Sequence, residues 1–201
     1  TAGETGRHDA AKAMIDALGM VPKLGVIVIG TTSRISLGNK GRQDIEVHVI
    51  GKAAHSSTPW AGVDAIEGLR QVLDQISRIT PSGGPHAGLG KPTLTPTFIE
   101  TVPRATHTVQ REAVLTLDRR LLPGQAAELA LDEVHKALHL PEPWRLERKP
   151  GPFMYPAAIR PEGLRGSALN AGCRAAGLAR PAACARVALR AEGPPPGIAP
   201  R

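Results

Sequence analysis

The strongest constraint on the fold is the order in which strand and helix periodicities follow one another between residues 39 and 149. Residues 44–50 (DIEVHVI) alternate polar and apolar side chains, which indicates a strand with one buried face. Residues 61–79 and 125–140 repeat apolar side chains at helical spacing. Residues 93–101, 113–117 and 144–147 are typical of further strands. The order β-α-β-β-α-β predicts a ferredoxin-like domain, a four-stranded antiparallel sheet with both helices on one face.

The segments on either side of this domain have another pattern. Residues 24–29 (LGVIVI) follow a helix predicted over 10–18 and form a short β-branched run, typical of a parallel strand buried on both faces. One such strand cannot build a sheet. We therefore expect an α/β chain in which 1–38 and 150–201 are pieces of an incomplete α/β domain, and 39–149 is an α+β domain. The second piece ends in an irregular tail rich in Ala, Arg and Pro.

The charge and composition exclude several classes of partner. The formal net charge is +7, but basic residues are scattered and aromatic residues make up only 2% of the chain. A nucleic-acid partner is therefore not expected. No apolar run approaches membrane-spanning length, so no membrane partner is expected either. Cys173 and Cys184 lack the CxxC spacing of a metal site and favour a reducing compartment, so a cytoplasmic location is expected.

Two stretches carry the most specific motifs. Residues 51–66 read GKAAHSSTPWAGVDAI, preceded by a Lys-Gly pair at 40–41, and residues 107–125 read HTVQREAVLTLDRRLLPGQ. Together they resemble the lid, or dimerisation, domain of the dinuclear zinc amidohydrolases and metallopeptidases. That family includes acetylornithine deacetylase, succinyl-diaminopimelate desuccinylase, aminoacylase and glutamate carboxypeptidase. Its lid has the β-α-β-β-α-β order that the periodicity indicates independently.

The resemblance implies roles for four residues. His55 matches the lid histidine that reaches across a dimer and donates to the tetrahedral oxyanion. Arg120 matches the arginine that clamps the substrate carboxylate through two parallel hydrogen bonds. His107 stands where the family often has asparagine, and is expected to donate a hydrogen bond to substrate. Glu4, in TAGETG, matches one of two adjacent glutamates, the general base or a metal ligand, and the choice between these roles stays open.

Plainer interpretations stand beside these roles. His55 is alternatively a polar loop residue near the start of a helix, with Ser57 or Thr58 acting as the helix cap. Arg120 is alternatively a solvated charge at a strand end. Arg119 beside it is expected to be such a charge.

The resemblance also implies a cofactor and a reaction. In the family, two zinc ions activate a bridging water that attacks an amide carbonyl of an N-acyl amino acid or peptide-like substrate. Only Glu4 is a candidate zinc ligand here, because the turn at 30–33 (GTTS) has no carboxylate. We therefore expect a truncated hydrolase that does not retain the zinc pair or turn over substrate.

Two alternatives remain. In one, the lid serves as a non-catalytic dimerisation or interaction module, and in the other the chain is a fragment with no separate function. For the lid itself we expect a homodimer formed through the open sheet face and an edge strand.

Overall fold

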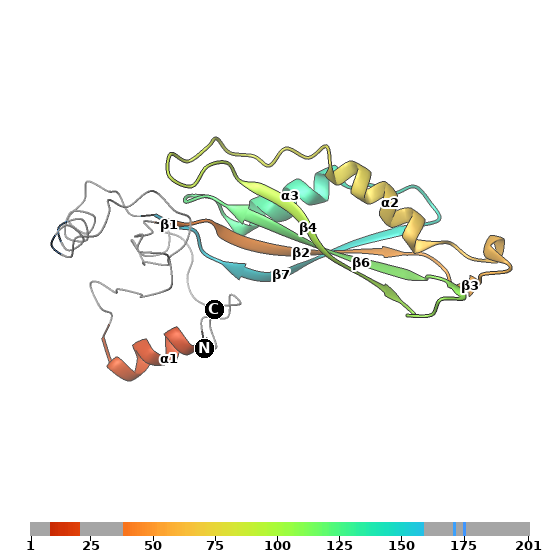
Figure 1. The fold of residues 1–201 in the computed structure, drawn as a ribbon, viewed down its shortest axis with the longest axis horizontal. Helices are drawn as coiled ribbons and strands as arrows, with labels where there is room; N and C mark the ends of the chain where they lie inside the picture. The colour runs from red at the N-terminus through yellow and green to blue at the C-terminus, as the bar shows by residue number, and fades with distance from the viewer. Residues whose placement is uncertain (1–8, 21–37, 159–170, 172–174, 176–201) are drawn as a thin grey trace.

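The structure is a computed structural model that describes residues 9–20 and 38–158, together with 171 and 175. The main body follows the order β-α-β-β-α-β, as the sequence predicts. Its elements are β2 (Gly41–Ile50), α2 (Ala65–Ile76), β4 (Thr93–Val102), β6 (Glu112–Leu121), α3 (Ala127–Ala137) and β7 (Arg145–Met154) (Figure 1). The shorter elements are α1 (Asp9–Leu18), β1 (Gly38–Asn39), β3 (Ala54–His55), a 3-10 turn (Pro59–Ala61), β5 (Thr108–Val109) and β8 (Ala157–Ala158).

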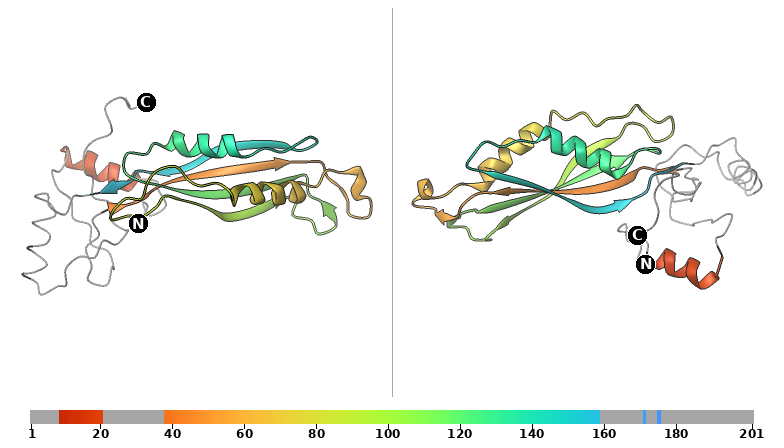
Figure 2. Two further views of the ribbon diagram at one scale, coloured as in Figure 1. Left: turned by 90° about the horizontal axis from the view of Figure 1, so that it is seen from above. Right: turned by 180° about the vertical axis from the view of Figure 1, so that it is seen from behind.

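The four long strands form one antiparallel sheet in the order β4-β6-β2-β7. The first and third long strands, β2 and β6, are central, while β4 and β7 form the edges. Both helices lie on the same side of this sheet (Figure 2). The ferredoxin-like fold predicted for the central domain is therefore confirmed.

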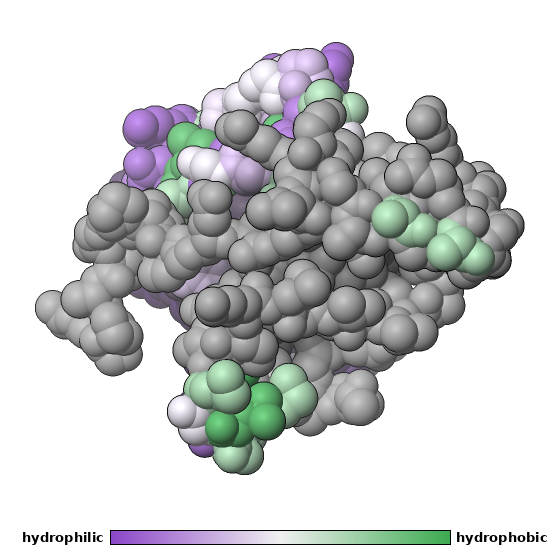
Figure 3. All heavy atoms as spheres, turned by 90° about the vertical axis from the view of Figure 1, so that its left-hand side faces the viewer, coloured by the Kyte–Doolittle hydropathy of each residue, from purple (hydrophilic) through white to green (hydrophobic). Residues whose placement is uncertain are grey.

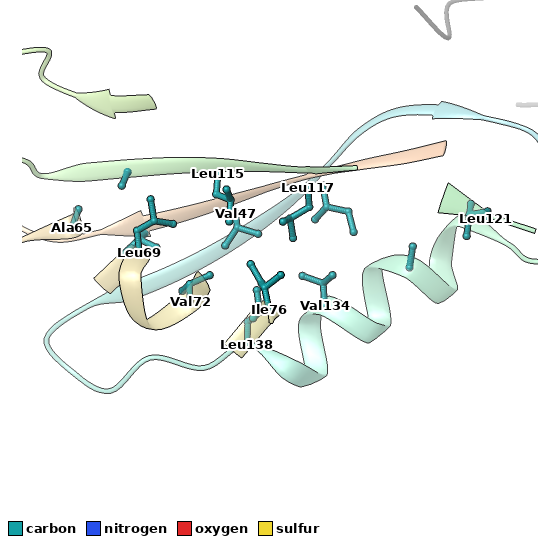
Figure 4. Packing of buried hydrophobic residues seen from close by; sticks show 14 residues of the cluster. Val47, Ala65, Leu69, Val72, Ile76, Leu115, Leu117, Leu121, Val134 and Leu138 are labelled. Atoms are coloured by element: carbon teal, nitrogen blue, oxygen red, sulfur yellow. The ribbon is translucent and has the colours of Figure 1, made fainter. Parts of the chain in front are cut away.

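The core is a single aliphatic layer between the sheet and the two helices. Alternate residues of β2 and β6 point into it and meet side chains from α2, from α3 and from the residue that follows α3 (Figure 4). Full burial of one Val, Leu or Ile side chain contributes about 1.5–3 kcal/mol. The cluster consists of Ile45, Val47, Val49, Ala65, Leu69, Val72, Ile76, Ala113, Leu115, Leu117, Leu121, Ala130, Val134 and Leu138.

The helices are shorter than the periodicity predicts. The helix expected from residue 61 begins at Ala65, because the carboxylate of Asp64 accepts a hydrogen bond from the Ile66 N–H (2.9 Å) and caps the first turn. The helix expected over 125–140 spans only Ala127–Ala137, because Leu138 has an extended backbone. Its side chain still fills the core, which explains why the apolar periodicity continues past the helix end.

The closing strand is longer than predicted. Residues 144–147 are expected as a short strand, but β7 continues to Met154 through Pro150 and Pro152. Prolines are tolerated here because β7 is an edge strand. Gly151 lets β7 approach β2 closely, since a Cβ at this position would lie 3.0 Å from Cβ of Asp44.

Arg119 corrects one sequence-based expectation. It is expected as a solvated strand-end charge, yet its side chain is 0% exposed. The reason is strand alternation, which places residue 119 on the helix-facing side with Leu117 and Leu121. Its guanidinium pairs with Glu133 of α3 at 2.9 Å.

The two sheet edges differ in character. On β4, Phe98 and Ile99 are exposed apolar side chains, 56% and 48% accessible. On β7, Pro150 and Pro152 lack the N–H that a neighbouring strand would need. The face away from the helices carries charged side chains and one histidine on the central strands: Arg42, Asp44, Glu46, His48, Glu112, Asp118 and Arg120.

Outside the lid, the helix predicted over 10–18 is present as α1, and Gly19 ends it at a φ of 62°. Met14, Leu18 and Met20 are exposed, and Figure 3 shows this apolar patch in green at the bottom of the view. The strand predicted over 24–29 and the tail from 176 onward lie outside the described residues. Among the residues that are described, none of the helices is long and apolar enough to cross a membrane.

Candidate functional site

His55 lies on a loop whose base is closed between residues 52 and 63. The N–H of Lys52 donates to the Val63 carbonyl (2.9 Å), and the N–H of Val63 donates back to the Lys52 carbonyl (2.8 Å). Two glycines permit this approach. A Cβ on Gly51 would overlap the Val63 carbonyl, and a Cβ on Gly62 would lie 2.7 Å from the Lys52 carbonyl oxygen. The glycines of the motif therefore shape the loop that presents the imidazole.

Ser57 holds the neutral His55 ring in one tautomer. The backbone N–H of Ser57 donates to Nδ1 at 3.2 Å, and the Ser57 hydroxyl lies 2.9 Å from the same nitrogen. Because a backbone N–H only donates, Nδ1 must accept, and the proton resides on Nε2. Nε2 makes no hydrogen bond within the part of the chain that the structure describes. His55 is exposed and therefore offers an oriented N–H donor.

The capping alternative for this loop is wrong. Ser57 bonds the imidazole, and the Thr58 side chain makes no cap hydrogen bond to the 3-10 turn that follows it. Asp64 caps α2 instead. The hydroxyl-rich turn thus serves the histidine rather than the helix.

His107 joins His55 in space. Strand β3 pairs with β5, which places His55 opposite Thr108, and the Ser56 N–H donates to the His107 carbonyl (3.0 Å). The centroids of the two imidazole rings are 5.9 Å apart, at an interplanar angle of 48°. Two candidate residues that are distant in sequence are therefore brought to one end of the lid.

Arg120 lies on the open face of the sheet, away from His55. Its Nε and Nη2 donate to the two carboxylate oxygens of Asp118, at 2.7 and 2.9 Å. The side chain keeps 38% of its surface exposed, and Nη1 makes no hydrogen bond among the described residues. Asp118 thus orients the guanidinium and leaves the edge formed by Nη1 and the second N–H of Nη2 free to bind another carboxylate.

His55 and Arg120 are too far apart to share a small ligand within one chain. Along β6, Arg120 lies opposite Arg42 and Glu112 lies opposite Ile50, and His55 lies beyond Ile50. Eight residues at about 3.4 Å each separate Arg120 from Glu112, or about 27 Å. A molecule the size of an amino acid spans less than half of that distance, so His55 and Arg120 of one chain do not reach the same small ligand.

Zinc does not fit the residues that the structure describes. Within 9–20 and 38–158, no three His, Cys, Asp or Glu side chains gather in a way that would hold a metal ion. Glu4 lies outside the described residues, as does the turn at 30–33. The chemistry assigned to the lid is therefore limited to what its imidazole and guanidinium groups do.

Sequence reasoning missed the side chains that orient Arg120 and lie beside it. Asp118 belongs to the second motif, but the motif alone assigns it no role. Arg42, which lies opposite Arg120, belongs to neither motif. The signal for Asp118 was available, because residues i and i+2 of a strand share a face. The position of Arg42 beside Arg120 depends on the register between β2 and β6, which the sequence alone does not specify.

A peptidase dimerisation domain model matches residues 37–144. The chain belongs to the M20 dimerisation-domain family. His55, His107 and Arg120 lie inside the matched M20 domain, and Glu4 lies outside it.

Known relatives are longer than this M20 chain. The uncharacterised Escherichia coli protein YgeY is 31% identical over 121 residues, which are 60% of this chain and 30% of YgeY. Aminopeptidase PepT from Bacillus cereus superposes with a TM-score of 0.61 at 13% identity, over 86% of this chain and 46% of PepT. An M20 family metallo-carboxypeptidase from Sulfolobus solfataricus gives 0.53 at 18% identity, over 75% and 47%. The chain spans less than half of each relative's length.

Proposed function

We propose that this chain is the lid of a metal-dependent hydrolase acting on N-acyl amino acids or peptide-like amides that carry a free carboxylate. The observation that carries the proposal is the pair of oriented donors at the two ends of one M20 dimerisation domain. Nε2–H of His55 suits a developing amide oxyanion, and the guanidinium of Arg120 suits a substrate carboxylate. The peptidases among the structural relatives support this class of substrate.

Other residues have subordinate roles in the proposal. His107, 5.9 Å from His55 between ring centroids, donates a further hydrogen bond to substrate. Glu4 acts as general base or zinc ligand, together with residues outside the lid. The zinc ions supply Lewis acidity and an activated water when they are bound.

The proposal requires a homodimer, and the β4 edge is the surface that suits it. Phe98 and Ile99 on β4 are exposed, as is Ile66 on α2 (50%). In a two-fold pairing of β4 with β4, the strands run antiparallel, so the Thr93 end of one lies beside the Val102 end of the other. Because Thr93 pairs with Arg120 and Val102 with Glu112, the His55 end of one lid adjoins the Arg120 end of its partner.

Trp60 supports a composite site of this kind. It follows the His55 turn and is 81% exposed, the largest exposed fraction among the large apolar side chains of the described residues. Trp is a side chain that proteins place in interfaces rather than in water. The exposed indole, five residues after His55, is therefore expected to touch the partner chain.

The double substitution Phe98→Asp, Ile99→Asp is expected to convert the dimer into a monomer. Buried carboxylates facing each other across the two-fold axis would remove the apolar contact and add repulsion, so the dissociation constant should rise at least about 100-fold. Light scattering at micromolar concentration measures this change. Tyr155→Asp is a matched control, since Tyr155 is 61% exposed but lies beyond β7. A double variant that stays dimeric would exclude the β4 edge as the interface.

Metal analysis and turnover separate the hydrolase from a non-catalytic module. The purified chain would be supplied with zinc, its metal content measured, and N-acyl amino acids offered as substrates. Two zinc ions per chain with turnover would support the hydrolase. A dimer with neither metal nor turnover would support the module.

A further inference from the structure

The open face of the sheet holds two arginines side by side. Arg42 on β2 is the register partner of Arg120 on β6, and Asp44 is the partner of Asp118. Like charges directly opposite each other on one face of a sheet are unfavourable, and an alternating arrangement would avoid them. Each arginine instead pairs along its own strand with the aspartate two residues away.

The two ion pairs have the same geometry. Nε and Nη2 of Arg42 donate to the carboxylate oxygens of Asp44, at 2.8 and 2.5 Å, just as Arg120 engages Asp118. These hydrogen bonds occupy the side of each guanidinium that faces back along its side chain. The outer edge, Nη1 with the second N–H of Nη2, has no partner within the described residues on either arginine.

The two arginine side chains are more exposed to solvent than the aspartates that pair with them. The side chains of Arg42 and Arg120 are 24% and 38% exposed, whereas those of Asp44 and Asp118 are 12% and 17% exposed. A ligand that reaches this face therefore meets the outer edges of two guanidinium groups first. The hydrogen bonds to Asp44 raise the pKa of Arg42, so it stays charged.

The pair lies at the end of the lid where the chain leaves for the flanking segments. The short strands β1 and β8 pair beside it, at Gly38 with Ala158 and Asn39 with Ala157. Thr93 flanks Arg120 and Met154 flanks Arg42 in the same row across the sheet. A ligand that binds the open face at this end of the sheet would meet this row of residues.

We propose that Arg42 and Arg120 form one site for two carboxylates, and that the substrate is an N-acyl amino acid with a second carboxylate. The inference rests on the proposed role of Arg120 as the carboxylate clamp. Directly opposed residues have Cβ atoms about 5 Å apart, which suits two carboxylates a few bonds apart in one small molecule. Each carboxylate receives two parallel hydrogen bonds from one outer guanidinium edge. Arg42 thereby selects dianions over monoanions.

The test uses two probes that differ in one group, N-acetyl-L-glutamate and N-acetyl-L-glutamine. Binding to the full chain is measured by NMR titration of arginine side-chain N–H signals. We expect the wild type to bind N-acetyl-L-glutamate about tenfold more tightly, since it adds a charge-assisted pair of hydrogen bonds. Arg42→Gln should abolish this preference, so that N-acetyl-L-glutamate binds no more tightly than N-acetyl-L-glutamine.

Control variants keep the outcomes separate. Arg145→Gln removes an arginine that pairs with Glu147 near the other end of the sheet, and should change neither affinity. The double variant Arg42→Gln, Asp44→Asn leaves no unpaired carboxylate, and should repeat the Arg42→Gln result if the single variant folds poorly. A wild type without preference for N-acetyl-L-glutamate, or an Arg42 variant that keeps it, would overturn the inference. If Arg120→Gln leaves both affinities unchanged, the proposed clamp itself fails.

Discussion

Replacing Glu133 with alanine is expected to lower the free energy of unfolding by about 3–5 kcal/mol. The guanidinium of Arg119 is 0% exposed, and it donates to Glu133 from Nε (2.9 Å) and Nη2 (3.1 Å). Without the carboxylate, a buried positive charge would lose its counter-charge. Glu133 also accepts from the N–H of Ser82 (2.9 Å), so the loop before β4 would lose its attachment to α3. Urea unfolding followed by circular dichroism measures the loss.

A double variant separates the charge effect from lost packing. Replacing a buried ion pair by apolar side chains of similar volume is often close to neutral. We therefore expect Arg119→Met, Glu133→Leu to recover most of the stability that Glu133→Ala loses. If the double variant is as unstable as the single one, the pair is not the cause.

The lowered pKa of Glu133 should also make the free energy of unfolding depend on pH. Burial of Glu133 by itself raises its pKa, but the hydrogen bonds from Arg119 and Ser82 outweigh burial and hold the pKa below its usual range. The lowered pKa means that Glu133 contributes fully at pH values above the unfolded carboxyl pKa of about 4.3. The contribution is lost as the pH falls below this value and through the folded pKa. Acid titration of Glu133→Gln should show a smaller loss than the wild type does.

Replacing His55 with alanine is expected to lower kcat of the proposed hydrolase about 10²–10³-fold, the usual cost of one oxyanion donor. KM should change little, because Nε2–H acts on charge that develops only in the transition state. Steady-state kinetics on an N-acyl amino acid, with zinc supplied, measures the effect. Ser56→Ala is a matched control on the same turn, since its side chain contacts neither ring in the hydrogen bonds described.

Mixing variants tests whether the site is composite. His55→Ala and Arg120→Ala should each be inactive alone. A mixed dimer would contain one site with both residues intact, so random exchange should restore about a quarter of the wild-type activity. A mixture no more active than its components would show that His55 and Arg120 do not serve one site across the dimer.

Local patterning was sufficient for the elements of the lid. Alternation in 44–50 and helical spacing in 61–79 and 125–140 depend on neighbours within a few residues, and they identified the right element types. The predicted ends of α3 and β7 were wrong, because tertiary contacts determine where these elements stop. Leu138 keeps the apolar period but leaves the helix, and β7 continues through two prolines because β2 is available as a partner.

The candidate site divides in the same way. His55, His107 and Arg120 were identified from motifs, and the structure places them at two ends of the sheet. Their orientation was not predictable, because it depends on hydrogen bonds whose geometry the motif does not specify. The burial of Arg119 was not predicted either, because the sequence does not indicate that Glu133 of α3 pairs with it.

Residue type and short-range spacing in the amino-acid sequence determined the element order and the aliphatic core, and the resemblance of two motifs to a known family indicated the candidate histidine and arginine. The tertiary structure decided which charges are buried, which tautomer His55 adopts and which arginines lie side by side. Those properties arise from strand register and long-range packing, which join residues far apart in the chain.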